Sequence, residues 1–258
     1  MQIPCNRMHL RLIRHATLRL EAGGRRLVVD PMLDAAASRP PVADTENDRR
    51  NPLVDLPEPA DVVLEGIDAV LVTHLHADHF DATAAERLPR DVPLLCQPED
   101  AGRLRAQGFT DVRPVDATAD LDGLTVVRVP ARHGYGADAE ALAPVSGFVL
   151  RDGGRTLYLA GDTVLYEDVE ATLDSHRPDV IVLNGGGARF TGGRPIVMDA
   201  DQVVAVARRV PDARVVVVHL DAINHCAQTR ADMHQRLHDE DLTEHVTVPE
   251  DGAAVPLD

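Results

Sequence analysis

The sequence predicts an α/β fold with a single domain over residues 1–258, in which two β-sheets pack between helices. Two strand-rich blocks, residues 9–31 and 124–162, carry short apolar runs separated by turn signals. Each block is followed by apolar runs of strand length that alternate with helix-like segments, the pattern of sheets covered by helices. A length of 258 residues with 44% apolar content is sufficient for a large buried core.

In the first half of the chain, paired strands are expected over residues 9–31, where the runs HLRLIRHATLRL and LVVDP flank the turn EAGGRR. The later elements follow from apolar runs, caps and glycines. They are, in order, a buried strand in DAVLVTH (68–74), a short helix in DATAAERLP (81–89) with Asp81 as N-cap, a strand in VPLLC (92–96), and a helix in PEDAGRLRAQGF (98–109) that ends at Gly108.

The second half repeats this progression from strands to alternating helices and strands. Its hairpin is centred on the turn Asp152-Gly153-Gly154, a strong turn signal between apolar runs. The expected elements are, in order, a strand in LTVVRVPARHG (124–134), the hairpin in 146–163, a helix near 165–175, a strand in PDVIVLN (178–184), a helix near 199–209, a strand in RVVVVH (214–219), a helix near 229–238 and a short strand in HVTVP (245–249).

Residues 31–60 are rich in Pro, Asp and Ala and show little periodicity, so they predict a long loop. Such a loop either borders a functional site or forms a surface excursion. The loop GGGARFTGGRPIVM (185–198) is the second long connection. Substrate choice is expected to depend on these two loops.

Charge and composition restrict the partners. A formal net charge of −16 repels a phosphate backbone, so we expect no nucleic acid partner. No apolar run approaches the roughly 20 residues of a membrane span, and the first residues lack the apolar stretch of a signal peptide. The odd, widely spaced set Cys5, Cys96 and Cys226 favours a reduced environment. We therefore expect a cytoplasmic protein with a small-molecule substrate and no membrane partner, and leave a homo-oligomer open.

The stretch THLHADHFD (73–81) concentrates three histidines and two aspartates directly after an apolar run. With 12 His and 42 Asp+Glu among 258 residues, the pattern H-x-H-x-[DE]-H is expected about 0.004 times by chance. Imidazole and carboxylate are the usual ligands of zinc and similar divalent ions. His74 and His76 point to the same side of an extended segment, and Asp78 and His79 follow where the chain turns. One motif can therefore begin two adjacent metal sites.

Further candidate ligands stand where later strands end. His133 follows LTVVRVPAR, Asp162 follows TLYLAG and His219 follows RVVVV. Open α/β sheets place their sites at the carboxyl ends of strands, so these side chains are expected near the motif, with Asp162 suited to bridge two ions. For the other histidines an ordinary surface or core role is the preferred interpretation; these are His9, His15, His176, His234, His238 and His245.

These residues, in this order, resemble the metallo-β-lactamase-fold hydrolases, whose H-x-H-x-D-H motif is intact here. The resemblance implies a four-layer αβ/βα sandwich, with two mixed β-sheets packed face to face and helices outside. It also implies one ion held by His74, His76 and His133, a second held by Asp78, His79 and His219, and Asp162 as the bridge. The loop NGGGARF (184–190) looks most like the branch that includes L-ascorbate-6-phosphate lactonase.

The segment HLDAINHC (219–226) leaves one assignment open, because His219 and His225 both suit the second ion. His219 is favoured because it ends a strand, which makes His225 a second-layer or substrate-facing group. Cys226 is interpreted as a small buried thiol, with a zinc thiolate as the alternative. Arg189 and Arg230 are candidates for holding an anionic substrate group.

The sequence thus predicts a metal-dependent hydrolase with two divalent ions, zinc first and manganese or iron as alternatives. Ions roughly 3.5–4 Å apart hold a bridging hydroxide that attacks a small ester, lactone or phosphodiester. Asp78 accepts and orients the proton, and His225 is an additional donor to the developing oxyanion. The alternatives are a nuclease of the same superfamily and a metal-binding protein without catalysis.

Overall fold

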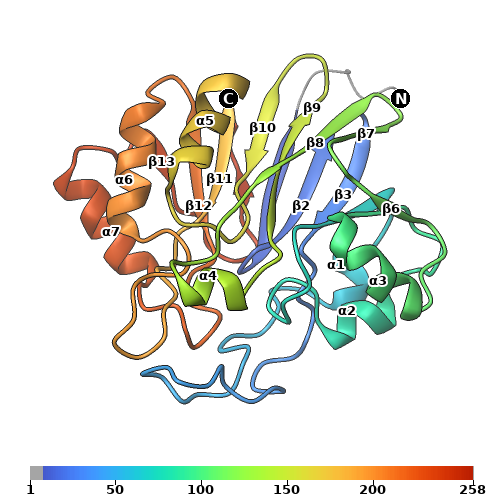
Figure 1. Ribbon diagram of the computed structural model, residues 1–258, viewed down its shortest axis with the longest axis horizontal. Coiled ribbons are helices and arrows are strands. Elements are labelled where there is room, and N and C mark those ends of the chain that lie inside the picture. The colour runs from blue at the N-terminus through green and yellow to red at the C-terminus, as the bar shows by residue number, and fades with distance from the viewer. Residues whose placement is uncertain (1–7, 258) are drawn as a thin grey trace.

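The structure, a computed structural model, describes residues 8–257. Two seven-stranded sheets pack face to face, with α1–α3 on one outer side and α5–α7 on the other, so the molecule has four layers (Figure 1). This is the αβ/βα sandwich that the sequence predicts. Cys5 lies outside the described residues.

The N-terminal sheet has the strand order β14-β1-β2-β3-β4-β5-β6. It begins with antiparallel pairs and becomes parallel from β3 onward. The strands are β1 (His9–Arg14), β2 (Thr17–Ala22), β3 (Arg25–Val29), β4 (Ala69–Val72), β5 (Leu94–Cys96), β6 (Val112–Pro114) and β14 (Ala254–Val255).

The C-terminal sheet repeats this plan in the order β13-β12-β11-β10-β9-β8-β7. Its strands are antiparallel from β7 to β10 and parallel from β10 to β13. They are β7 (Thr118–Leu121), β8 (Leu124–Pro130), β9 (Ser146–Arg151), β10 (Thr156–Leu159), β11 (Val180–Asn184), β12 (Arg214–Val218) and β13 (Val246–Thr247).

The helices are short and flank the two sheets. They are α1 (Ala60–Val63), α2 (Ala82–Arg87), α3 (Ala101–Ala106), α4 (Ala137–Ala141), α5 (Glu167–His176), α6 (Ala200–Arg209) and α7 (Arg230–Asp239), with a 3₁₀ turn at Pro98–Asp100. The predicted cap of α2 is confirmed, because the Asp81 carboxylate accepts a hydrogen bond from Ala84 N at 2.8 Å. No helix within residues 8–257 combines the length and apolarity that a membrane crossing requires.

The central strands are buried on both faces, which explains their unbroken apolar runs. In β4, Leu71 packs between the sheets while Val70 packs against the helices of its own half. In β11, Val182 packs between the sheets and Ile181 faces the helices of the other half. Since alternate residues point to opposite faces, one strand joins two core layers.

The elements that the sequence pattern missed are all short. They are α1, α4, β6, β7 and β14, and each contains between two and five residues. None is long enough for a periodic pattern to stand out from its flanking loop. Every element that the sequence predicts is present in the structure at the expected place.

Candidate metal centre

The candidate metal centre lies at one edge of the sandwich, where the carboxyl ends of strands from both sheets meet. β4 leads into His74, β8 into His133, β10 into Asp162 and β12 into His219. Parallel strands deliver their following residues to the same edge. The structure brings together all seven residues that the sequence nominates as ligands, namely His74, His76, Asp78, His79, His133, Asp162 and His219.

The first group of candidate ligands contains His74, His76 and His133, whose ligand atoms lie within 4.8 Å of one another. His74 Nε2 lies 3.0 Å from His76 Nδ1, and His133 Nε2 lies 3.2 Å from Asp162 Oδ2. Zinc–nitrogen bonds of 2.0–2.1 Å at a tetrahedral angle separate two nitrogens by about 3.3 Å. The spacing of these atoms is therefore that of ligands to one ion.

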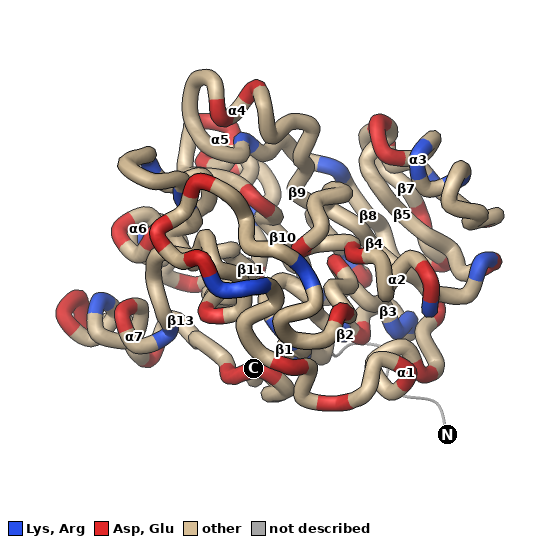
Figure 2. Tube along the Cα trace, turned by 90° about the horizontal axis from the view of Figure 1, so that it is seen from below, with Lys and Arg blue, Asp and Glu red and all other residues tan. Residues whose placement is uncertain are grey.

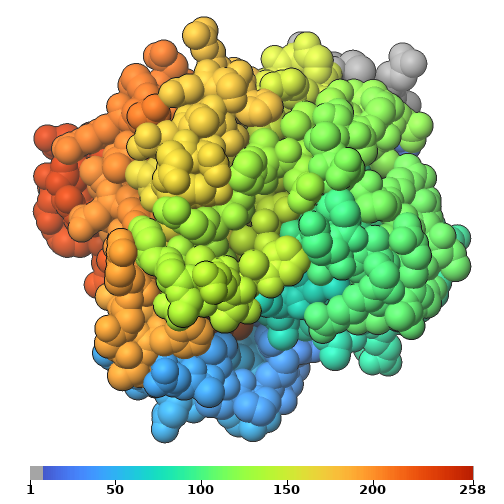
Figure 3. Space-filling view, in the orientation of Figure 1, coloured from blue at the N-terminus to red at the C-terminus, as the bar shows by residue number. Residues whose placement is uncertain are grey.

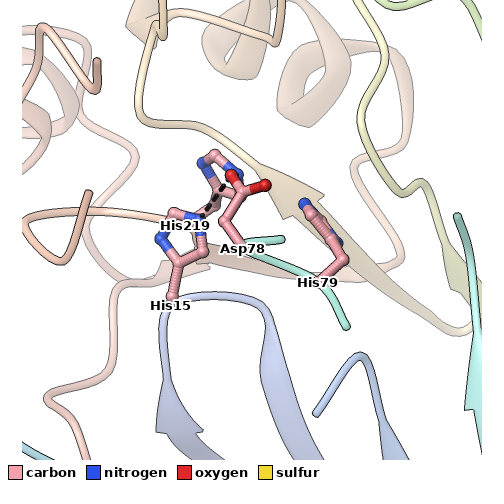
Figure 4. Close-up of side chains that lie close together, drawn as sticks. All are labelled: His15, Asp78, His79 and His219. Carbon is pink, nitrogen blue, oxygen red and sulfur yellow. Dashed lines mark hydrogen bonds and ion pairs between the residues drawn. The ribbon is translucent and has the colours of Figure 1, made fainter. Parts of the chain in front are cut away.

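The second group contains Asp78, His79 and His219, whose side chains point toward one another in Figure 4. The chain bends after His76, since the His76 carbonyl accepts hydrogen bonds from His79 N and Phe80 N, both at 2.9 Å. This bend brings Asp78 and His79 beside His219, while the His79 ring stays close to that of His74, with centroids 4.2 Å apart. His219 Nε2 then lies 3.6 Å from Asp78 Oδ2.

Asp162 stands between the two groups and presents one oxygen to each. Its Oδ2 faces His133, while its Oδ1 lies 3.2 Å from His79 Nε2 and 3.5 Å from His219 Nε2. Asn184, at the end of β11, donates from Nδ2 to Asp162 Oδ1 at 2.6 Å and so orients the carboxylate. Asp162 thus presents one oxygen to each group of candidate ligands.

A buried network behind the first motif orients its histidines. Asp30, directly after β3, accepts hydrogen bonds from Thr73 N, from the Thr73 hydroxyl and from His79 Nδ1, at 2.7, 2.7 and 2.8 Å. Because the hydroxyl proton of Thr73 goes to Asp30, its oxygen accepts from His74 Nδ1 at 3.0 Å. Both histidines therefore use Nδ1 for this network and direct Nε2 toward Asp162.

His133 is oriented in the same way from the other half of the molecule. Its Nδ1 donates to the carbonyl of Ile196 at 2.8 Å, which leaves Nε2 as the free nitrogen. Ile196 belongs to the long loop between β11 and α6. That loop therefore positions a candidate ligand as well as lining the cleft described below.

The electrostatics of the centre favour a bound cation. Burial acts against the charged form of Asp162, yet His79 and His219 hold the pKa of this carboxyl well below its usual value. Burial also acts against a charge on His219, yet Asp162 raises the pKa of His219 to about 10. Burial and the neighbouring His79 hold the pKa of His74 well below its usual value. The carboxylates are thus anionic and draw positive charge into the centre.

Whether this donor set fits metal ions can be tested on the polar atoms at the middle of the centre, because these atoms lack protein partners. Asp162 Oδ2, His79 Nε2 and His219 Nε2 are buried and make no hydrogen bond of good geometry with any residue in the range 8–257. A buried unsatisfied polar atom is costly. Two imidazole-rich sets flanking one carboxylate satisfy these atoms if each set holds an ion.

Three residues of the centre adopt a left-handed backbone conformation that side-chain-bearing residues rarely tolerate. The φ angles are +61° at His15, +44° at Asp30 and +65° at His219. Each follows the end of a strand, where the chain must turn sharply within the plane of the sheet edge. Strain of this kind persists only where the surrounding structure enforces it, and it concentrates at functional sites.

Comparison with known proteins places these observations in a family. The β-lactamase superfamily domain matches residues 25–220. The chain is 33% identical over 249 residues to the UPF0173 protein YddR of Bacillus subtilis, covering 95% of this chain and 98% of that protein. It belongs to the metallo-β-lactamase superfamily. Within that superfamily it belongs to the UPF0173 group, in which the relative from Azorhizobium caulinodans is named a metal-dependent hydrolase.

Two solved structures extend the similarity over nearly the whole chain. A possible metal-dependent hydrolase from Veillonella parvula superposes with a TM-score of 0.93 at 33% identity, covering 96% of this chain and 98% of that one. An isothiocyanate hydrolase from Delia radicum gut bacteria superposes with a TM-score of 0.92 at 32% identity, covering 96% and 99%. This UPF0173 chain is accordingly a metal-dependent hydrolase.

Beside the metal centre of this metallo-β-lactamase-fold protein lies a cleft of about 440 Å³. His76, Asp78, His133 and His225 form its floor. Its walls are mainly apolar and comprise Val42, Leu75, Ala77, Leu142, Phe190, Ile196 and Ile223, with Arg39, Asn51 and Arg103 as the polar members. The centre thus opens onto an apolar chamber of small-molecule size.

The long loop of residues 31–60 borders this cleft. Of the two alternatives that the sequence left open, a loop beside a functional site and a surface excursion, the first is therefore the one observed. Arg39, Val42 and Asn51 line the cavity. In the space-filling view the loop, coloured blue, lies against orange residues of the C-terminal half (Figure 3). The hydrogen bond from Thr191 N to the Asp44 carbonyl, 2.8 Å long, joins the loop to residues 185–198.

His15 lies within the centre, although the sequence interpretation preferred an ordinary surface or core role for it. It is fully buried, its ring lies over that of His219 with centroids 3.6 Å apart, and its Nε2 lies 3.4 Å from Asp78 Oδ2. It shares a possible metal-holding group with Asp78, His79 and His219. The available signal was its place directly after β1, which runs parallel to β3 in the same sheet.

His225 and Cys226 take different places around His219. His225 lines the cleft, and its Nε2 lies 3.8 Å from Asp78 Oδ2. The Cys226 thiol lies 3.5 Å from His219 Nδ1, on the side of the ring opposite Nε2. This geometry favours His219 as the ligand and His225 as the substrate-facing group, and it separates the half-buried thiol from the metal positions.

The two arginines suggested for an anionic substrate group differ in their surroundings. Arg230 is buried and bonds to Asp221 Oδ2 at 2.8 Å, to the Pro249 carbonyl at 2.9 Å and to Asp251, so that suggestion is wrong for Arg230. Arg189 lines a smaller pocket of about 190 Å³ that adjoins the cleft at His225.

Proposed function

We propose that this protein hydrolyses small, uncharged electrophiles that carry an apolar group, such as esters, lactones and isothiocyanates. The single observation that carries the proposal is the apolar cleft that opens directly onto the cluster of seven candidate ligands. An apolar substituent gains free energy by leaving water for such walls, about 25 cal/mol per Å² buried. The reactive carbon of the substrate is thereby held beside the metal centre.

Two divalent ions fit the residues present, with zinc as the first candidate and manganese or iron as alternatives. One would be held by His74, His76 and His133, and the other by Asp78, His79 and His219, with Asp162 between them. When bound, the ions supply a strongly nucleophilic hydroxide at neutral pH and withdraw electron density from the electrophile.

The surrounding side chains have separate tasks. Asp78 lies at the floor of the cleft as an anion, and its carboxylate accepts the proton that the attacking water loses. His225 lies beside it, and burial lowers its pKa to about 4, so the ring is neutral near pH 7. A neutral imidazole N–H donates a hydrogen bond to the oxygen or nitrogen that becomes negative during attack.

The substrate class follows from the cleft and the family. Arg39 Nε lies 2.8 Å from Asp34 Oδ2, so the charge of Arg39 is already paired. Arg103 is the other arginine of the lining, but most of the wall is apolar, so we propose an uncharged substrate in preference to a phosphodiester. The isothiocyanate hydrolase among the relatives supports a linear N=C=S electrophile. Water adds across the C=N bond of such a substrate, and the resulting thiocarbamate breaks its C–N bond to give an amine and carbonyl sulfide. Esters and lactones are retained because the same attack on a carbonyl carbon fits this centre, and the NGGGARF loop resembles the lactonase-like branch.

The wider setting of the protein is also proposed. The acidic residues are spread over many helices and loops with arginines interspersed (Figure 2), so we propose no nucleic acid or membrane partner. Free thiols at Cys96 and Cys226 are consistent with a cytoplasmic location. A homo-oligomer would require a polar interface, since within residues 8–257 the exposed large hydrophobic side chain is that of Val62.

The test is a turnover panel with benzyl isothiocyanate, p-nitrophenyl butyrate, a γ-lactone and bis-p-nitrophenyl phosphate. Untagged protein is loaded in turn with zinc, manganese and iron, and chelated protein is the control. We expect metal-dependent turnover of at least one of the first three substrates, with lower kcat/KM for the diester. Preferential turnover of the diester would contradict the assignment of an uncharged substrate, and absence of all turnover would contradict the proposed function.

A further inference from the structure

Asn224 occupies an unusual position between the candidate metal centre and the long N-terminal loop. It lies in the connection after β12, directly before His225, and its side chain is 3% exposed. Its amide is enclosed by residues 39–51, which are more than 170 positions away in the sequence. A single side chain thus joins two segments that the sequence separates widely.

Residues 39–51 form a closed loop with paired ends. Arg39 N donates to the Asn51 carbonyl at 2.8 Å, and Asn51 N donates to the Arg39 carbonyl at 2.9 Å. The Arg50 guanidinium reinforces this neck through hydrogen bonds to the carbonyls of Ala37 and Ser38, at 2.8 and 2.9 Å. The loop is therefore a compact surface unit with its ends together and its polar interior available to an inserted side chain.

The Asn224 amide forms hydrogen bonds with the polar groups inside that loop. Its Oδ1 accepts from Asn51 Nδ2 at 2.6 Å and from Val42 N at 2.9 Å. Its Nδ2 is within hydrogen-bonding distance of the Asn47 carbonyl, the Thr45 hydroxyl and the Val42 carbonyl, at 2.6, 2.7 and 3.1 Å. Its backbone N–H donates to Asn51 Oδ1 at 2.9 Å. The loop thus depends on one amide for both donors and acceptors.

This arrangement distinguishes asparagine from the residues that resemble it. Aspartate has the same shape but no N–H, so its carboxylate would face the carbonyls of Val42 and Asn47. Alanine would leave the buried Asn51 amide and Val42 N without a partner. A fully satisfied buried polar network holds a unique conformation, whereas a partly satisfied one does not.

The same loop and the same connection supply neighbouring parts of the cleft wall. Val42 and Asn51 line it from the loop, and Ile223 and His225 line it from either side of Asn224 in the chain. Val42 packs against the cluster that contains Ile223, and the hydrogen bonds of Asn224 hold the two parts of the wall together. The side chain itself does not line the cleft, so its effect on a bound substrate is indirect.

We infer that Asn224 is a positioning residue that holds the loop of residues 39–51 as a preformed wall of the cleft and so sets the fit of the apolar group of the substrate. This inference rests on the proposed function. Because the wall is preformed, substrate binding does not have to order the loop. In a variant with a mobile loop, the free energy needed to order it would weaken substrate binding. Loss of the hydrogen bonds is therefore expected to change KM more than kcat.

The experiment compares Asn224→Ala, Asn224→Asp and Asn51→Ala with the control Asp48→Ala. Asp48 lies in the same loop with an exposed side chain and is not among the hydrogen-bond partners of Asn224, so the control trims the loop without removing a partner of Asn224. For the best substrate in the panel we expect KM to rise about 10-fold in the first three variants, with kcat changed less than about 3-fold. Metal content stays unchanged, and hydrogen exchange in residues 39–51 becomes faster. The control resembles the wild type in all four measurements.

The outcomes separate this inference from the proposed function. If the wild type turns over no substrate, the proposed function fails, and hydrogen exchange still reports whether Asn224 orders the loop. If the wild type is active and the variants exchange faster with unchanged KM, Asn224 is structural only and the inference is overturned. If Asn224→Ala does not fold, Asn224→Asp provides the KM readout, because Asn224 does not line the cleft. Asn51→Ala then reports loop order through hydrogen exchange, because it removes two of the hydrogen bonds and leaves Asn224 in place. The double variant Asn51→Ala/Asn224→Asp gives a further check. If its KM change equals the sum of the two single changes, expressed as free energies, the inference is contradicted, because partners in one network are not independent.

Discussion

The two sheets of this protein share one plan but supply the metal centre in different ways. Each has seven strands, antiparallel at one side and parallel at the other. The N-terminal sheet contributes four candidate ligands from one loop after β4, which are His74, His76, Asp78 and His79. The C-terminal sheet contributes one at a time, namely His133 after β8, Asp162 after β10 and His219 after β12.

The difference shows that residues of one site meet in two ways, either through proximity in the sequence or through the direction of separate strands. Residues in a single loop converge because a tight bend places them together, whereas residues after separate strands converge because those strands end at the same edge. The first arrangement needs only local geometry. The second needs the register of the whole sheet, so it depends on the core between the sheets.

The largest effect is expected for Asp162→Ala, which removes the carboxylate between the two groups. We expect about two metal ions per chain in the wild type and one or fewer in the variant, by plasma mass spectrometry. Activity should fall by at least about 1,000-fold in kcat/KM, because both halves lose a shared ligand. Asp116→Ala is the matched control, since that carboxylate is almost fully exposed. Full metal content in a folded Asp162→Ala protein would contradict the bridging role of Asp162. It would also contradict the contrast drawn between the two sheets.

The second prediction compares the two additional histidines beside Asp78, one from each half. His225→Ala should lower kcat about 100-fold with unchanged metal content, since it removes a donor at the cleft floor. His15→Ala should lower the thermal stability and the metal content, because a fully buried ring packed on His219 is lost. Melting curves, metal analysis and steady-state kinetics distinguish the two patterns. An exchange of these patterns between the two variants would reverse the roles assigned to them.

The third prediction concerns the side chains that orient the ligands from behind. In the N-terminal half, Asp30→Asn weakens the carboxylate that accepts hydrogen bonds from His79 and Thr73. In the C-terminal half, Asn184→Ala removes the amide that donates to Asp162. Each is expected to weaken zinc affinity about 10- to 100-fold, as is typical for residues behind a metal ligand. Competition with a fluorescent chelator measures this affinity. Equal affinity to the wild type in both variants would show that the ligands are held by the backbone alone.

The smallest effect is expected for Thr229→Ala, which removes the capping box at the start of α7. A loss of about 1 kcal/mol in the free energy of unfolding is expected, with kcat/KM unchanged, because α7 packs on the outer face of its sheet. Asp81→Ala at the start of α2 is the counterpart in the other half. It should also reduce activity, since Asp81 follows the motif and accepts a hydrogen bond from Asp34 N at 2.6 Å. Urea unfolding and kinetics on both variants test this asymmetry.

Much of the fold could be predicted because it depends on local patterns. The apolar runs at 69–72, 180–184 and 214–218 form buried strands, and Asp81 caps a helix as its position suggests. The candidate ligands could be predicted because each follows such a run. Asp30 follows β3 by the same rule, yet its role depends on Thr73 and His79, which only the adjacent strand β4 brings within reach.

The sequence by itself determined the sandwich, the candidate ligand motif and the membership of the chain in its superfamily, because periodicity and short spacings act over a few residues. Only the tertiary structure decided that His15 lies over His219, that Ile196 orients His133, and that Asn224 holds the loop of residues 39–51. Each of these contacts joins segments at least 60 residues apart in the chain. Their partners are set by how two sheets pack and where their strands end, and a hydrogen bond between distant segments leaves no periodic trace in either of them.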